Sequence, residues 1–309
     1  MINIYKRASI DEGLSKIDKY DTGAWISAVN PSAEEITELS KELNIEEDVF
    51  KLALDEDEKP RIQLEETYKL IIIRVAYGTD ESEINVTPLT IIVTQKHLVT
   101  ISLREIEELS HFLKKLPKNF FTTKKTRFFL QILSRANGHF QKVLADIEKK
   151  IETKEKLLLK SMKNEEIVEL LDIQKSLLYI NTAVASNDKV LERILNGKVL
   201  KLFDEDEDLL ESIIYENKES IEMVNIYTNI LANTMDAYAS IINNNVNIVM
   251  KFLASVTIII AIPSIVASFY GMNVDIPFES SPFAFVYVIV ISVILTIIPA
   301  YYFAKKGYF

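Results

Sequence analysis

Two uncharged apolar runs near the carboxyl end constrain this chain more than any other feature. The first, residues 252–270, contains nineteen residues, and the second, residues 283–303, contains twenty-one. A helix needs about 20 mostly apolar residues to cross the ~30 Å hydrocarbon core of a membrane. We therefore predict two transmembrane helices. The alternative is a buried helical hairpin in a soluble core, which two such runs separated by a short loop do not favour.

Basic residues beside the two runs predict their orientation. Lys251 precedes the first run, and Lys305 and Lys306 follow the second, whereas residues 271–282 contain no Lys or Arg. In membrane proteins the cytoplasmic flanks carry the excess of positive charge. We therefore expect a multi-pass protein of the cell membrane with both termini in the cytoplasm. We expect no secretion signal, because the first ten residues lack an apolar core.

The residues before the first run predict an α/β cytoplasmic domain that leads into helices. Residues 251–309 carry three Lys and two acids, so the 250 residues before them hold a net charge of −11. This charge argues against nucleic acid as a partner, since nucleic-acid binding needs basic patches. Strands are expected at 2–7, 24–29, 61–65, 68–77, 84–94 and 97–103, in a meander or mixed sheet. From residue 106 onward the chain is expected to be helical, with a break at residues 161–164 between two antiparallel helices.

A single long helix should join the cytoplasmic part to the first membrane span. Residues 205–262 contain neither Gly nor Pro, and as one helix they would be about 85 Å long. Such a rod must project to the membrane and pack against copies of itself, which predicts a funnel-shaped homo-oligomer. The predicted segments are a sheet part at 1–104, a helical part at 105–202, a stalk at 203–250, membrane helices at 251–270 and 283–304, an outer loop at 271–282 and a basic cytoplasmic tail at 305–309.

From Asn229 onward, one face of this long helix is polar or small, except at Met250. Steps of four and three residues give the members Asn229, Asn233, Asp236, Ser240, Asn243, Asn247, Met250, Ala254, Thr257, Ala261, Ser264, Ser268 and Gly271. Small residues in membrane helices also serve close helix packing. That alternative explains the alanines, but it does not explain why the same face continues as Asn and Asp below the membrane. We therefore predict a water-filled axis, which several copies must enclose.

A second, apolar seam on the same helix is expected to pack against the stalks of adjacent copies. Its members are Leu210, Ile214, Ile221, Val224, Leu231, Met235, Tyr238 and Ile242. Signals for an enzyme are missing from the sequence. The chain has three His without ligand spacing, no Cys, and seven Gly without a phosphate-binding loop. We therefore expect no catalytic site, no organic cofactor and no ATP-driven pumping.

Gly271, Met272 and Asn273 directly follow the first apolar run. Between two apolar runs at the end of a chain, this tripeptide resembles the signature of the CorA family of divalent-cation channels. The resemblance implies a pentamer whose selectivity filter is Gly271, Met272 and Asn273. It also implies that Asp236 faces a hydrated ion and that Asn247, Met250 and Leu253 form an inner constriction. Family members often carry a large apolar residue where this chain has Ala261. The resemblance therefore does not assign a second hydrophobic constriction to this chain.

The chemistry of Mg²⁺ suits these residues. Mg²⁺ prefers octahedral oxygen coordination and loses water reluctantly, so a ring of Asn273 carbonyls would hold the hydrated ion through its waters. Asp275 and Glu279 would concentrate cations at the outer mouth. The resemblance further implies that Mg²⁺ regulates the channel from inside. Candidate sensors lie in or near the acidic run of residues 204–208, namely Asp208, Glu211 and Glu216; a simply solvated charge run is the alternative.

Two other functions fit the same sequence. One is a transporter of the same fold that carries Co²⁺, Ni²⁺ or Zn²⁺, because the tripeptide alone does not fix the ion. The other is a membrane-anchored metal sensor or scaffold that conducts nothing. The polar face that continues through the membrane speaks against the scaffold, and leucine substitutions at Thr257 and Ser264 would test it.

Overall fold

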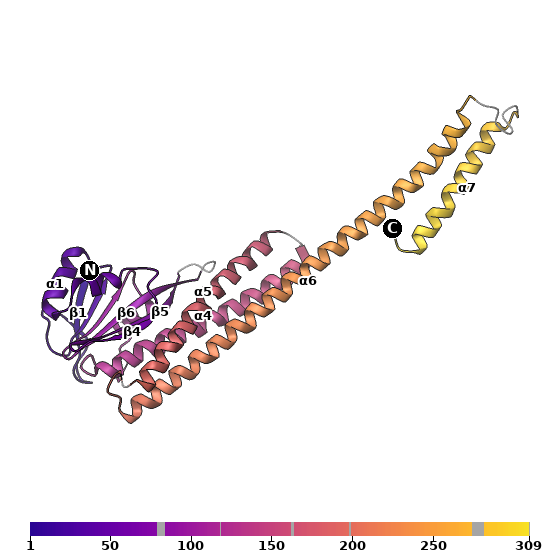
Figure 1. The fold of residues 1–309 in the computed structure, drawn as a ribbon. Helices are drawn as coiled ribbons and strands as arrows, with labels where there is room; N and C mark the ends of the chain where they lie inside the picture. The colour runs from indigo at the N-terminus through magenta and orange to yellow at the C-terminus, as the bar shows by residue number, and fades with distance from the viewer. Residues whose placement is uncertain (79–83, 118, 162–163, 198, 274–280, 309) are drawn as a thin grey trace. The chain divides into compact units, whose positions relative to one another are not determined.

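The structure, a computed structural model, describes residues 1–78, 84–117, 119–161, 164–197, 199–273 and 281–308. It contains two compact units, Met1–Asn233 and Thr234–Phe309. The first unit holds a sheet and the helices that cover it, and the second holds the end of the longest helix and the last helix of the chain (Figure 1). The strands are β1 (Ile2–Lys6), β2 (Ser15–Ile17), β3 (Trp25–Val29), β4 (Arg61–Leu64), β5 (Tyr68–Tyr77), β6 (Asn85–Thr94) and β7 (Leu98–Ser102). The helices are α1 (Ala33–Leu43), α2 (Glu47–Leu52), α3 (Glu107–Lys114), α4 (Lys125–Ser161), α5 (Asn164–Asn196), α6 (Asp204–Tyr270) and α7 (Ala284–Lys305).

The strands form one mixed sheet in the order β2-β1-β3-β7-β6-β5-β4. β3 and β7 pair in parallel, whereas every other neighbouring pair is antiparallel. The six strands predicted from the sequence are present, and the prediction of a mixed sheet is confirmed. The sequence does not predict β2, because this strand has only three residues, two of them polar and exposed, at the edge of the sheet.

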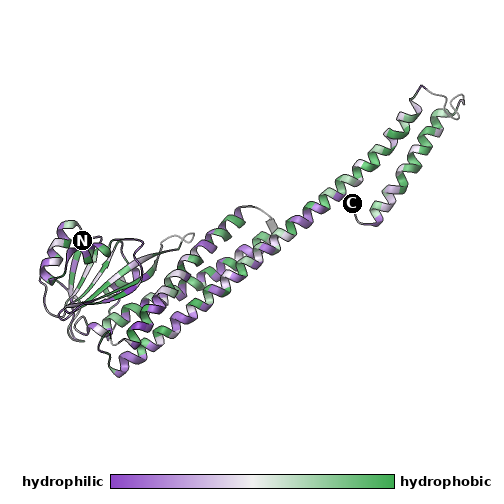
Figure 2. Ribbon diagram, viewed as in Figure 1, coloured by the Kyte–Doolittle hydropathy of each residue, from purple (hydrophilic) through white to green (hydrophobic). Residues whose placement is uncertain are grey.

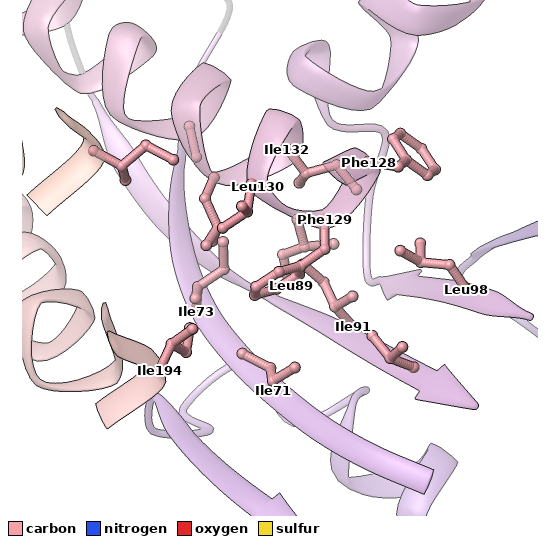
Figure 3. Packing of buried hydrophobic residues seen from close by; sticks show 14 of the residues in the cluster. Ile71, Ile73, Leu89, Ile91, Leu98, Phe128, Phe129, Leu130, Ile132 and Ile194 are labelled. Carbon is pink, nitrogen blue, oxygen red and sulfur yellow. The ribbon is translucent and has the colours of Figure 1, made fainter. Parts of the chain in front are cut away.

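Both faces of the sheet are buried, as the apolar centre of β5 requires. Successive side chains of a strand point to opposite faces. Leu70 and Ile72 therefore pack with α1 and α2 on one face. Ile71 and Ile73 pack on the other face, where α4 covers the sheet (Figure 3). All four side chains are at most 1% exposed, and burying each one stabilises the fold by about 1.5–3 kcal/mol relative to exposure.

Asn187 of α5 completes the hydrogen bonding of β5. The ladder between β4 and β5 ends at the pair Arg61 and Ile72. Two residues further along β5, the side-chain Oδ1 of Asn187 accepts from Arg74 N at 2.9 Å, and its Nδ2 donates to Arg74 O at 2.7 Å. Asn187 is only 4% exposed. Its amide thus takes the place of a strand residue and attaches α5 to the sheet.

The helices of the first unit follow the predicted order with one correction. The predicted break at residues 161–164 falls between α4 and α5. The helix expected from residue 106 onward, however, is interrupted after Lys114 and resumes only at Lys125. Pro117 disfavours helix in the residue before it, and Phe120 is fully buried in the core. The non-helical connection therefore places an aromatic side chain that a continuous helix would have carried elsewhere.

The beginning of α6 packs on α4 and α5 of its own chain. The fully buried Asn217 donates from Nδ2 to Val184 O at 3.1 Å, and Asn137 donates from Nδ2 to Ile213 O at 2.7 Å. Five members of the apolar seam are at most 8% exposed within the single chain, namely Leu210, Ile214, Val224, Leu231 and Tyr238. The prediction that these five pack against adjacent copies is wrong, because their own chain already covers them.

The second unit contains the two apolar helices. The last part of α6 and the whole of α7 are long and apolar enough to cross a membrane, and α7 runs back beside the end of α6 (Figures 1 and 2). Only 6% and 0% of their most apolar windows are buried inside the structure. A buried hairpin in a soluble core is therefore the wrong alternative. α6 runs through Pro263 and ends at Tyr270, the predicted end of the first membrane helix.

Candidate functional site

The predicted polar and small stripe lies along the last part of α6. In the single chain its residues are exposed to solvent, apart from Ala261, which is half-buried. The exposed members are Asp236, Ser240, Asn243, Asn247, Met250, Leu253, Ala254, Thr257, Ser264 and Ser268. Met250 and Leu253 are 58% and 55% exposed and form an apolar level between Asn247 and Ala254. Among the described residues, nothing in a single chain covers this face.

The stripe points away from α7. Ser255 and Val266 are 2% and 9% exposed, and Pro263 and Ala267 line a groove that α6 shares with α7. These positions mark the side of α6 that packs within the unit. Thr257 stands nine residues before Val266, and at about 100° per residue the two side chains lie on opposite sides of the helix. Ser264 and Ser255 are related in the same way, so α7 leaves the stripe free.

The hydroxyl groups of the stripe present acceptors to their surroundings. Thr257 Oγ1 donates its hydrogen to Leu253 O at 2.8 Å, and Ser264 Oγ donates to Ile260 O at 3.4 Å. With the hydrogen used inside the helix, the oxygen lone pairs remain to accept hydrogen bonds from water. The waters around a divalent cation are polarised donors, so this surface suits a hydrated cation.

Charge along this part of α6 is sparse. Between residues 223 and 273 the sequence contains two charged side chains, Asp236 and Lys251. Asp236 is on the stripe, whereas the Lys251 ammonium lies 5.8 Å from the centroid of the Tyr308 ring, which stacks in turn on Phe303. The sequence analysis does not predict this contact; its signal is Gly307, whose φ of +70° turns the chain back after α7. The contact places the Lys251 ammonium beside Tyr308 and off the stripe.

The stripe ends at the Gly-Met-Asn tripeptide. α6 ends at Tyr270, after which Gly271 N donates to Ala267 O at 3.0 Å and Met272 N donates to Phe269 O at 3.3 Å. A Cβ at Gly271 would lie 3.3 Å from Ala267 O, so glycine fits this close turn. A shallow surface groove of about 420 Å³ connects Ala261, Ser264 and Ser268 to Met272. Asn273 is exposed beside it, while Asp275 and Glu279 lie outside the described residues.

The residues predicted to sense Mg²⁺ do not form a site within one chain. Asp208 and Glu211 are exposed one turn apart on α6, and Glu216 is half-buried and accepts from Ser212 Oγ at 3.4 Å. Among the described residues of the single chain, no group of three His, Cys, Asp or Glu could hold a metal ion. Asp206, from the same acidic run, is 6% exposed and pairs with Arg127 at 3.1 Å. Asp206 therefore attaches α6 to α4.

Comparison with known proteins identifies the family. The family model described as "CorA-like Mg2+ transporter protein" matches residues 20–306, which is nearly the whole chain. This chain belongs to the CorA family. The match includes strands β3 to β7, the long helix and both apolar helices.

Individual relatives agree with this assignment. The chain is 29% identical over 295 residues to the cobalt/magnesium transport protein CorA of Methanocaldococcus jannaschii, covering 92% of this chain and 90% of that protein. It is 22% identical, over the same shares of the two chains, to the magnesium transport protein CorA of Helicobacter pylori. The solved structure of the complete CorA magnesium transporter from M. jannaschii superimposes with a TM-score of 0.90 at 26% identity, covering 100% of this chain and 99% of that one. These homologues are transport proteins, and the two apolar helices fit membrane insertion.

Proposed function

We propose that this CorA protein is a Mg²⁺ channel of the cell membrane that admits the ion down its electrochemical gradient. The observation that carries the proposal is the continuous polar and small stripe on the face of α6 opposite α7. We assign residues 251–270 and 283–304 to the membrane and both termini to the cytoplasm. A lipid-facing role would favour large apolar side chains on the stripe, as on the other faces of these helices.

The channel is a homo-oligomer, because one chain contributes one stripe and cannot enclose a pore. Copies arranged about an axis, each with its stripe inward, would place α7 on the outside against lipid. The resemblance to the CorA family supports five copies. In that arrangement Asn247, Met250 and Leu253 form the inner constriction, and Ala254, Thr257, Ala261, Ser264 and Ser268 line the membrane part of the pore.

Selection takes place at Gly271, Met272 and Asn273. A ring of Asn273 side-chain carbonyls would accept hydrogen bonds from the waters that Mg²⁺ retains. Asp275 and Glu279 would raise the cation concentration at the outer mouth, and Asp236 would attract the ion at the inner end. An inside-negative potential supplies about 2.3 kcal/mol per charge per 100 mV, and twice that for a divalent ion. Transport therefore needs no ATP.

Intracellular Mg²⁺ closes the channel by binding between copies. Asp208 and Glu211 are the exposed acids available for this role, with Glu216 as a further candidate, while Asp206 is engaged with Arg127. A cation bound better by the closed arrangement stabilises it by that difference in affinity. Because the sensor would be shared between chains, its ligands need not meet within one chain.

Mg²⁺ entry into proteoliposomes under an inside-negative potential tests the proposal. The intact chain should admit Mg²⁺ rapidly, and Asn273→Ala should abolish the selective flux. Asn244→Ala is the control, since Asn244 is another exposed asparagine, lies in α6 and is not a member of the stripe. If Asn273→Ala and Asn244→Ala reduce the selective Mg²⁺ flux equally, Asn273 is not part of a selectivity filter.

Transport of Co²⁺ is the second candidate function, because the M. jannaschii relative is named a cobalt/magnesium transporter. If Co²⁺, Ni²⁺ or Zn²⁺ enters and Mg²⁺ does not, the protein is still a channel, but it transports a different divalent cation. No flux of any divalent cation would favour a metal sensor or scaffold.

A further inference from the structure

A groove of about 580 Å³ lies between α3 and α4 in the first unit, and the proposed ion path does not use it. One row of α4 residues, part of α3, the connection between them and Leu209 form its wall. Its volume is within the 300–1,000 Å³ typical of small-molecule sites. Gly138 leaves the groove open, since a Cβ there would meet no atom within 4 Å.

The groove contains a planar cation that is already positioned. The Arg135 guanidinium lies 5.2 Å from the centroid of the Phe112 ring, which supports one of its faces. No carboxylate among the described residues forms an ion pair with Arg135 or with Lys142, which lies two turns further along α4. Burial, together with the charges of Arg135 and Lys115, lowers the pKa of His111. A guanidinium supported in this way can stack its other face on a flat ring.

Two buried acceptors in the same wall lack donors. Glu108 is 5% exposed; its Oε1 lies 2.7 Å from His139 Nδ1, and its Oε2 has no hydrogen-bond partner among the described residues. Gln131 donates from Nε2 to Asn119 O at 3.2 Å, and its buried Oε1 also lacks a donor in the described part of the chain. A buried acceptor without a partner costs about 1–3 kcal/mol. A ligand that brings N–H or O–H groups would satisfy both.

The order of these groups along α4 indicates the shape of the ligand. Gln131, Arg135 and His139 follow one another at steps of four residues on one face, Glu108 sits at the level of His139, and Lys142 comes last. The row is about 16 Å long at 1.5 Å per residue, too long for an inorganic anion. Along the row come, in order, the acceptor Gln131 Oε1, the guanidinium of Arg135, the carboxylate of Glu108 and the ammonium of Lys142.

We propose that this groove binds a nucleoside monophosphate. The base would donate to Gln131 Oε1 and stack on the free face of Arg135. The ribose hydroxyls would donate to Glu108 Oε2, a use of carboxylates known from dinucleotide sites. The phosphate would bind Lys142, and the apolar side chains of Phe112, Pro117 and Leu209 would surround the flat body of the ligand.

Calorimetric titration of the full-length protein in detergent with AMP, at fixed free Mg²⁺, tests this proposal independently of transport. One AMP should bind per chain. Gly138→Leu should abolish binding by filling the groove, and Arg135→Gln should raise the Kd at least tenfold. Both positions are outside the buried core, and a thermal melt verifies that each variant folds. Arg135→Lys should bind with intermediate affinity, since it keeps the charge but loses the planar face.

Matched controls exist in the same chain. Gly13→Leu introduces the same side chain where a Cβ also meets nothing within 4 Å. Lys175→Gln removes another cation placed over an aromatic ring, that of Tyr179 at 5.9 Å. Both should bind AMP like the intact chain. Absence of binding at 1 mM AMP, or equal affinity in Gly138→Leu and the intact chain, would overturn the site. Inorganic phosphate that binds as tightly as AMP would overturn the assignment of a nucleoside ligand.

Discussion

Leucine in place of Thr257 or Ser264 provides the most direct test of the stripe. Each hydroxyl hydrogen is already donated to a backbone carbonyl, so the oxygen is left to accept from the waters of a passing ion. Leucine removes that acceptor and places a branched apolar side chain on the axis. A ring of such side chains excludes water from a pore.

The size of the effect follows from the number of copies. One hydrogen bond contributes about 0.5–1.5 kcal/mol net. If five copies each lose one contact to the hydrated ion, the barrier to passage should rise by at least ~2 kcal/mol. Because 1.36 kcal/mol corresponds to a factor of ten in rate, Mg²⁺ influx should fall roughly 30-fold or more for each substitution.

Thr296→Leu is the matched control for Thr257→Leu. Thr296 is also a membrane threonine whose Oγ1 donates to the carbonyl four residues earlier, that of Ser292 at 2.6 Å. It lines the groove between α6 and α7 instead of the stripe. Influx into proteoliposomes, normalised to the amount of assembled oligomer, should remain within a few-fold of the intact chain. If Thr257→Leu and Ser264→Leu conduct as well as Thr296→Leu, the stripe does not line a pore.

Three further predictions concern the first unit, Met1–Asn233. Asn187→Leu should destabilise it by about 2–4 kcal/mol, since both backbone groups of Arg74 lose their partner; faster hydrogen exchange at the Arg74 amide would verify the cause, and unchanged exchange would contradict it. The hydrogen bond that His139 donates to the Glu108 carboxylate raises the pKa of His139 above its ordinary value of 6.5. The pair should therefore stabilise the fold below that pH and lose its effect as the pH rises through the raised pKa. The intact chain should therefore melt at a higher temperature than His139→Gln at about pH 5.5, and this difference should be smaller at about pH 8.5. A difference that does not change with pH would contradict a stabilising contact between protonated His139 and Glu108. Glu211→Gln should raise several-fold the internal Mg²⁺ concentration that halves influx, and unchanged inhibition would remove Glu211 as a sensor.

The fold class could be predicted from sequence because its main signals are local. The apolar runs predict the two membrane helices, and the abundance of β-branched residues predicts β5 and β6. The parallel pairing of β3 with β7 is a contact between residues more than 70 positions apart, such as Trp25 and Leu98. No local pattern specifies that contact. The connection after Lys114 has a local signal in Pro117, but its course depends on the burial of Phe120 in the core, which no local pattern specifies.

The candidate site also has a part that local sequence predicts and a part that depends on tertiary contacts. The stripe from Asp236 to Ser268 follows from helical periodicity alone, which is why its members share one face. Which partner covers the other faces depends on tertiary packing, and for this reason Leu210 and Ile214 were assigned to the wrong neighbour. The groove beside Arg135 has no sequence motif, since α3, α4 and α6 each contribute to it.

The amide of Asn187 has a consequence for the fidelity of folding. The centre of β5, Leu70 to Ile73, is apolar on both faces, so a one-residue slip of this strand against β6 would still bury isoleucine on each side. Hydrophobic patterning therefore discriminates poorly between the correct and the slipped alignment. A side chain that recognises one particular peptide group, that of Arg74, does discriminate. The two hydrogen bonds between Asn187 of α5 and Arg74 therefore favour β5 in its native register.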